Sequence, residues 1–198
     1  LVELDDFEAT REAGKAIRNR ALDNLDVWLE IFQKNATARG ATVLFAETPA
    51  DINALVLEIA AQHHVGKIIK SKSMVSEESA LDHAIEAAGL TVVETDLGEY
   101  ILQINNYEAP SHIIGPALHK SKEEVAELFH KAHGTPVKTG IEELCLEARG
   151  VLRQHYLTAD MGISGGNFFV AETGSVVLVT NEGNATLTTT LPRVHVAI

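Results

Sequence analysis

Short apolar runs alternate with helical patterns through the middle of the chain, and this alternation restricts the fold more than any other feature. Four runs are typical of buried strands, at residues 42–46, 67–70, 90–94 and 111–114. Helical patterns lie between and beyond them, at residues 48–64, 76–88, 97–104, 121–133 and 141–155. Strand–helix alternation indicates a parallel sheet with helices on both faces, so we predict an α/β fold.

The segments on either side of this region have other patterns. Residues 3–39 space their apolar side chains like an amphipathic helix, and Gly40 supplies a stop, so we expect a long helical arm. Near the other end, tight turns separate three β runs at residues 168–172, 175–180 and 185–190. They predict an antiparallel meander added to a mostly parallel sheet. We interpret the glycine-rich residues 162–166 as a flexible turn that leads into the meander.

We therefore divide the chain into an N-terminal helical arm, residues 1–40, and an α/β domain, residues 41–198. A last strand pattern begins at Val194 and still continues at Ile198. Because folds rarely stop inside a strand, we expect this domain to be part of a longer protein.

Charge and cysteine content exclude several kinds of function. The 198 residues carry a formal net charge of −12, which disfavours attraction of the whole surface to nucleic acid or anionic lipid. No apolar run is long enough to span a membrane.

The one cysteine, Cys145, excludes an internal disulfide framework and suits a reducing cytoplasm. It also excludes an iron–sulfur cluster held by this chain alone, since such clusters normally take four thiolates. His130 and His133 lack a nearby third ligand, so we predict no metal site.

Polar side chains follow two of the predicted strands, at the edge where α/β sheets bind ligands. The first candidate segment, residues 70–74, has two lysines and two serines at the start of a helix, and Lys72 and Ser73 are candidates for binding an anion. The alternative is a solvated loop in which serines only cap the helix. At the end of the run 90–94 and just after it, the candidates for binding a substrate hydroxyl are Glu94, Thr95 and Asp96. Here the alternative is that Asp96 caps the next helix.

Two glycine-containing turns flank the apolar run 176–179. A hairpin turn does not require the glutamate of Glu172-Thr173-Gly174, so Glu172 is a candidate base or nucleophile and Thr173 and Gly174 are candidate ligands. The second turn, with the candidates Asn181, Glu182 and Asn184, is equally well explained by turn preferences alone. Asp160, just before the glycine-rich segment, is a second catalytic candidate.

Five of these segments together resemble the lactate utilization protein B family, whose members carry a LUD domain. The segments are residues 71–74, 94–99, 159–164, 170–175 and 180–184. The resemblance implies the fold of the sugar isomerase and CoA-transferase (NagB/RpiA/CoA transferase-like) superfamily. It also implies a role in oxidation of L-lactate to pyruvate as part of an iron–sulfur subunit, through substrate binding or docking to other lactate utilization subunits in the cytoplasm. Four-iron clusters are then expected in a ferredoxin-like module beyond residue 198, and the isolated chain is expected to be inactive.

Two other functions stay open at this point. One is an isomerase- or transferase-like enzyme that acts on a small anion or an acyl-CoA, with Glu172 as base or nucleophile and Lys72 as anion clamp. The other is a non-catalytic scaffold, in which the helical arm mediates assembly into an oligomer.

Overall fold

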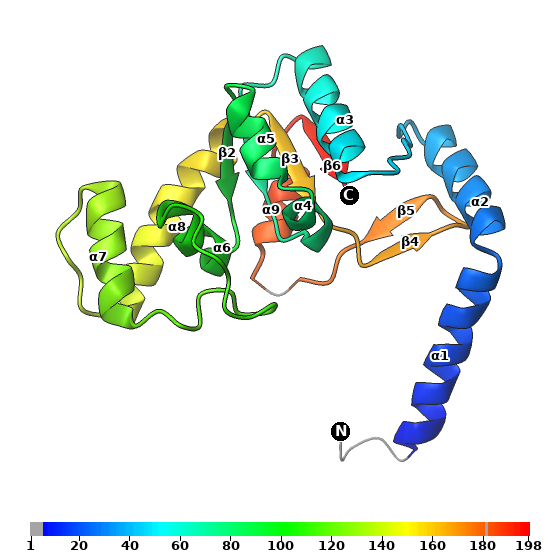
Figure 1. The fold of residues 1–198 in the computed structure, drawn as a ribbon, viewed down its shortest axis with the longest axis horizontal. Coiled ribbons are helices and arrows are strands. Elements are labelled where there is room, and N and C mark those ends of the chain that lie inside the picture. Colours follow the sequence, from blue (N-terminus) through cyan, green and yellow to red (C-terminus); the bar gives the residue numbers. More distant parts are fainter. Residues whose placement is uncertain (1–5, 181) are drawn as a thin grey trace. The chain divides into compact units, whose positions relative to one another are not determined.

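The computed structural model describes residues 6–180 and 182–198, which form two compact units (Figure 1). One unit contains the described residues up to Phe45 together with Asn167–Val177, and the other contains Ala46–Gly166 together with Leu178–Ile198. The second, larger unit carries the sheet predicted from the strand–helix alternation.

The sheet of the larger unit is parallel throughout. Its strands are β1 (Lys67–Lys70), β2 (Thr91–Glu94), β3 (Met161–Ser164) and β6 (Val194–Ala197), in the spatial order β2-β1-β3-β6. The chain first moves from β1 to β2 and then returns to the other side of β1. The order of strands therefore reverses between β1 and β3, which is the position where open α/β sheets bind ligands at their carboxyl ends.

Seven helices of the described chain belong to this unit: α3 (Pro49–Gln62), α4 (Met74–Glu78), α5 (Leu81–Ala87), α6 (Leu97–Ile104), α7 (Lys122–His133), α8 (Ile141–Thr158) and α9 (Asn184–Thr190). Local sequence explains where several of them begin. Thr48 and Ser121 each form a reciprocal capping box with the acidic residue three positions later. Asp96 accepts hydrogen bonds from the backbone N–H groups of Gly98 and Glu99 at the start of α6.

Hydrophobic side chains form one core on each face of the sheet. Ile69 and Val93 pack with α6, α7 and α8, whereas Ile68 and Val92 pack with α3 and α5. Successive residues of a strand point to opposite faces, so the apolar pairs in β1 and β2 serve both cores. This arrangement confirms the predicted α/β class.

The smaller unit contains α1 (Phe7–Asp23), α2 (Leu25–Ala38) and an antiparallel pair, β4 (Phe168–Val170) and β5 (Ser175–Val177). The predicted arm consists of two helices divided at Asn24, while its residues 3–5 lie outside the described residues. The rings of Phe32 and Phe169 lie 5.0 Å apart between their centroids. A Cβ on Gly174 would lie 2.3 Å from the backbone nitrogen of Ala36, so the hairpin turn needs glycine to approach α2.

Several predicted elements differ from the structure. Residues 42–46 and 111–114 belong to no helix or strand, and residues 185–190 lie in helix α9 rather than in a third β run. Consequently the antiparallel part is a separate two-stranded sheet. The predicted helix 76–88 is divided into α4 and α5, since Ala80 between them adopts a left-handed backbone with φ +52°.

The largest difference concerns β3, a central strand that the sequence interpretation assigned largely to a flexible turn. Its glycine is needed for packing, because a Cβ on Gly162 would lie 1.9 Å from the backbone oxygen of Thr188 in α9. From sequence alone, a strand glycine that allows close approach of a neighbouring helix looks the same as a glycine in a turn.

Candidate functional site

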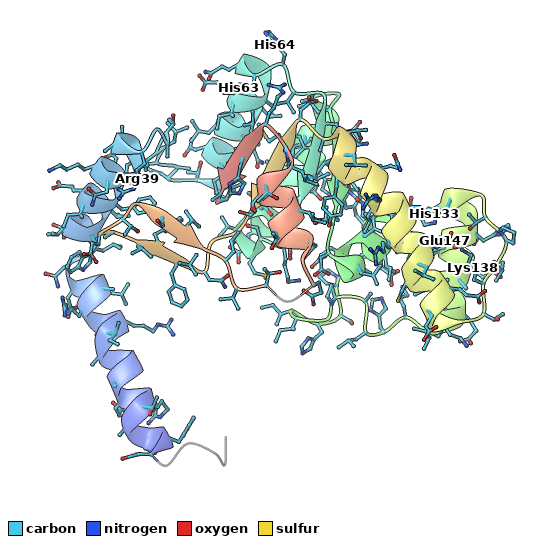
Figure 2. The ribbon with its side chains drawn as sticks, turned by 180° about the vertical axis from the view of Figure 1, so that it is seen from behind. Arg39, His63, His64, His133, Lys138 and Glu147 are labelled. Carbon is cyan, nitrogen blue, oxygen red and sulfur yellow. The ribbon has the colours of Figure 1, made fainter. Side chains whose placement is uncertain are left out.

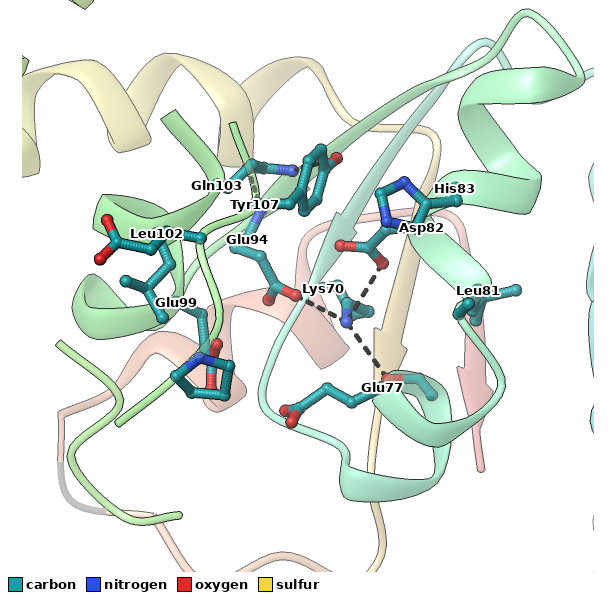
Figure 3. A pocket seen from close by; sticks show the side chains of 14 residues that line it. Lys70, Glu77, Leu81, Asp82, His83, Glu94, Glu99, Leu102, Gln103 and Tyr107 are labelled. Atoms are coloured by element: carbon teal, nitrogen blue, oxygen red, sulfur yellow. Dashed lines mark hydrogen bonds and ion pairs between the residues drawn. The ribbon is translucent and has the colours of Figure 1, made fainter. Parts of the chain in front are cut away.

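A buried lysine at the carboxyl end of β1 is the centre of the candidate site (Figure 3). The Lys70 Nζ atom lies 2.6 Å from Glu94 Oε1, 3.1 Å from Asp82 Oδ1 and 3.2 Å from Ser76 Oγ. Lys70 is only 2 % exposed. The three oxygen atoms come from β2, α5 and α4, so the cluster joins the two strands' ends to the helices that follow β1.

Strand register brings this lysine and its main partner together. β1 and β2 pair in parallel with Lys70 beside Glu94. The two residues point to the same face as Ile68 and Val92, which pack against α5. Asp82 then reaches the lysine from the first turn of α5.

The two carboxylates keep Lys70 charged despite its burial. Burial by itself would lower the pKa of Lys70, but Glu94 and Asp82 outweigh this effect and hold the pKa above its ordinary value. Burial raises the pKa of Glu94 well above its ordinary value; Lys70 opposes this increase, and the nearby Asp82 adds to it. Glu94 is 5 % exposed, and its Oε2 atom has no hydrogen-bond partner among the described residues.

A cavity of about 290 Å³ opens next to this cluster. It is lined mainly by acidic and hydrogen-bonding side chains, which include Lys70, Glu77, Asp82, Glu94, Gln103 and Tyr107 (Figure 3). Burial and the neighbouring Glu99 raise the pKa of Glu77 above its ordinary value. The cavity is therefore an acidic pocket, not the basic anion cradle that the lysine-rich segment suggested.

A second, adjoining pocket of about 240 Å³ contains Lys72. Glu77 and Glu99 border both pockets. Lys72 Nζ lies 2.5 Å from Glu99 Oε1, and its side chain is 29 % exposed. Burial by itself would lower the pKa of Lys72, but its bond to Glu99 outweighs this and raises it. Both lysines of the segment are thus already paired with carboxylates.

The structure brings the first group of predicted site residues together at the carboxyl edge, where most of them also support the fold. The Ser73 side chain caps α4, and Asp96 caps α6, as the alternative interpretations predicted. Thr95 is buried, where its hydroxyl donates to the Lys70 carbonyl and lies 3.1 Å from the Thr188 hydroxyl. Lys72 and Glu94 are the members of this group that line pockets.

Asp160 lies at the amino edge of the same sheet, just before β3. Its Oδ2 atom accepts hydrogen bonds from the backbone N–H groups of Gly66, at 2.9 Å, and Lys67, at 3.1 Å. These bonds lower the pKa of Asp160 below its ordinary value. Because the Lys70 cluster lies at the opposite edge, the structure does not bring Asp160 to it.

None of the described residues of the two glycine-containing turns is a member of the Lys70 cluster. Glu172, Thr173 and Gly174 form the β4–β5 turn of the smaller unit, where Asn35 Nδ2 donates to the carbonyls of Ala171 and Glu172. The Glu172 side chain is exposed. In the larger unit, Glu182 is exposed and Asn184 is the first residue of α9. Asn181 lies outside the described residues.

Sequence reasoning did not single out Lys70, Glu77 or Asp82. Lys70 was included in the candidate segment, but a lysine at the end of a short apolar run is usually solvated. The signal that could have found it is the register of the two strands, since pairing residues 67–70 with 91–94 places Lys70 beside Glu94. Asp82 carries no local signal, because it looks like an ordinary first-turn acid of a helix.

No metal-binding group of three or more His, Cys, Asp or Glu side chains is found in the part of the chain that the structure describes. Cys145 is the one thiol of the chain and is exposed on α8. Four-iron clusters normally take four thiolates, so the residues of this chain do not fit such a group.

The fold and the site define a doubly wound, parallel α/β domain with an acidic pocket at the carboxyl edge of its sheet. Residues 29–198 match the LUD domain family. The chain therefore belongs to the LUD domain family.

Several curated relatives of the chain share one name. The chain is 48% identical to "Lactate utilization protein B" of Geobacillus sp. (strain WCH70) over 99% of its own length and 41% of that protein. It is 48% identical to the protein of that name from Geobacillus thermodenitrificans over 100% and 42% of the two lengths, and 49% identical to that of Lysinibacillus sphaericus over 99% and 41%. The chain thus spans about two fifths of these curated relatives.

No solved structure matches the chain significantly. Within residues 6–180 and 182–198, every helix is too short or too polar to cross a membrane.

Proposed function

We propose that this LUD domain is part of a protein that contributes to the oxidation of L-lactate to pyruvate in the cytoplasm. The observation that carries the proposal is the 45–49% identity, along nearly the whole chain, to relatives named "Lactate utilization protein B". Electrons would pass through four-iron clusters. The remainder of the protein would hold these clusters, because this chain has a single thiol. The partners would be other lactate utilization subunits.

The charges of the site favour one of two roles for this domain. It would dock to other subunits, or it would bind a ligand other than lactate. Lactate is an anion and would need a free cationic group. Lys70 is surrounded by Glu94, Asp82 and Ser76, and Lys72 is paired with Glu99. An anion in the pocket would have to break one of these ion pairs in a region of low dielectric constant.

Growth on L-lactate tests the proposal. A strain that lacks the protein should fail to grow with L-lactate as its carbon source and should grow normally on pyruvate, provided that no second lactate dehydrogenase is present. The gene supplied in trans should restore growth. Growth on L-lactate equal to that of the parent strain would refute the proposed function.

A further inference from the structure

We propose that the pocket beside Lys70 and Glu94 binds a small organic ligand through a primary ammonium group. This inference goes beyond the proposed role in L-lactate oxidation, since it names the chemistry of a ligand that the domain itself would hold. It depends on three observations: the donor groups of Lys70, Gln103 and Tyr107 are occupied, two acceptors are open, and acidic side chains outnumber the one lysine in the lining.

Three donor side chains that line the pocket, those of Lys70, Gln103 and Tyr107, already have partners. An ammonium group has three N–H donors, and three oxygen atoms surround Lys70 Nζ. The Gln103 amide donates to the Val92 carbonyl, at 3.1 Å, and to the Tyr107 hydroxyl, at 3.0 Å. That hydroxyl in turn donates to Glu86 Oε1, at 2.6 Å. Each of these groups could therefore donate to a ligand carboxylate or phosphate only by giving up its present hydrogen bond.

The acceptors, by contrast, include two that are open. Glu94 Oε2 and Glu77 Oε1 are buried atoms without a hydrogen-bond partner in the described part of the chain, and both side chains line the cavity. Glu94 is 5 % exposed, so its second oxygen is largely shielded from bulk water. A buried carboxylate oxygen without a donor is costly, and a ligand N–H group would remove that cost.

The lining charge selects a cation. The cavity is lined by one lysine and by the five carboxylates of Glu77, Asp82, Glu94, Glu99 and Glu108. Glu99 and Glu108 have lysine partners of their own, in Lys72 and Lys120, whereas Glu77 has no ion pair among the described residues. Burial is the largest cause of the raised pKa values of Glu77 and Glu94, and an ammonium ion beside them would favour their charged forms.

The occupied carboxylate oxygens favour an ammonium group over a metal ion. Asp82 Oδ1 and Glu94 Oε1 are held by Lys70, and the described residues contain no cluster of three potential metal ligands. Two open acceptors match the directed N–H groups of an ammonium, with hydroxyls of the same ligand able to bond to the remaining lining groups. A cavity of about 290 Å³ suits a small molecule.

Titration calorimetry of the full-length protein with three probes tests the proposal. Ethanolamine carries an ammonium and a hydroxyl, glycerol carries hydroxyls only, and L-lactate carries a carboxylate and a hydroxyl. All are titrated in phosphate buffer at matched ionic strength, because amine buffers would compete. We expect saturable binding of ethanolamine, and at least tenfold weaker binding of the other two.

Variants assign the binding to the pocket. Glu94→Gln should weaken ethanolamine binding at least tenfold, while Glu127→Gln, on the exposed surface of α7, should leave it unchanged. Glu77→Gln, at a half-buried position, gives the same test if Glu94→Gln does not fold by circular dichroism. Three results would overturn the proposal: no binding of ethanolamine, glycerol binding as strong as that of ethanolamine, or L-lactate binding that depends on Glu94. Growth on L-lactate is a separate readout, so each proposal can fail alone.

Discussion

At the scale of single residues, Lys70 connects the fold with the candidate site. A buried lysine is tolerated only where carboxylates compensate for the loss of water, and here Glu94 and Asp82 do so. The same residues leave the pocket acidic. The residue that fixes the carboxyl ends of β1 and β2 thus also determines which ligands the neighbouring cavity can accept.

Replacing Lys70 should therefore destabilise the protein strongly. Lys70→Met leaves Asp82 and Glu94 buried without a cation, and we expect the free energy of unfolding to fall by about 3–5 kcal/mol. Lys72→Met removes a lysine whose side chain is 29 % exposed, so it should cost clearly less than Lys70→Met. Urea denaturation compares the two variants. Equal losses of unfolding free energy in the two variants would contradict the described pairing of Lys70 with Glu94 and Asp82.

A second buried carboxylate gives a pH-dependent prediction. Glu147 of α8 lies 2.8 Å from His133 Nδ1 and 3.0 Å from Lys138 Nζ (Figure 2). Burial by itself would raise the pKa of Glu147, but hydrogen bonds from Thr135, His133 and Lys138 lower it to about 2. Because the pKa is lower in the folded than in the unfolded state, the charge stabilises the fold above pH 4.5, and this contribution is lost as the pH falls toward 2.

Thermal unfolding of Glu147→Gln against wild type tests this prediction. At pH 7 the variant should be less stable by about 2 kcal/mol, because it loses charge-assisted hydrogen bonds. The difference should shrink as the pH is lowered from about 4.5 toward 2. A difference that stays constant over this range would mean that the ionised carboxylate is not the stabilising species.

The residue scale also shows how much of the site sequence alone could predict. Lys72, Ser73, Glu94, Thr95 and Asp96 were expected at the carboxyl edge, and they lie there because they directly follow or end β1 and β2. The pairing of Lys70 with Asp82 could not be predicted. It depends on how α5 packs against the sheet, and no local pattern encodes that distance.

At the scale of elements, the clearest lesson comes from α9 and β3. Residues 185–190 contain several threonines, whose β-branched side chains favour strands. The segment is nevertheless helical: Thr188 is fully buried beside Thr95, and α9 approaches β3 at Gly162. Tertiary contacts thus override local propensity at both positions, which explains why residues 185–190 are predicted as a β run and residues 162–166 as a turn. Capped helices such as α3 and α7 were predicted correctly because their signals are local.

The close approach of α9 to β3 leads to a further prediction. Gly162→Ala places a methyl group against the Thr188 backbone oxygen, so α9 must move, and stability should fall by about 1–3 kcal/mol or more. Gly150→Ala in α8 is the matched control. Its added Cβ meets no atom within 4 Å, and it should stabilise the helix by about 0.5–1 kcal/mol. Urea denaturation that found Gly162→Ala as stable as wild type would contradict the described packing.

At the scale of the whole molecule, the α/β class followed from the strand–helix alternation because that pattern reflects burial on both faces of a parallel sheet. Assignment to the LUD domain family rests on residues 29–198, which include most of the described fold. The chain spans about two fifths of its curated relatives, and the proposed activity is that of a whole protein of this kind. The domain's contribution must therefore be measured in the full protein.

The rate of pyruvate formation from L-lactate in cell extracts tests the central claim most directly. Extracts of a strain that lacks the protein are compared with extracts of the same strain carrying the full-length gene, under conditions where no other lactate dehydrogenase is active. We predict that the rate is lost in the first strain and restored in the second. The account is contradicted if both extracts form pyruvate from L-lactate at the same rate.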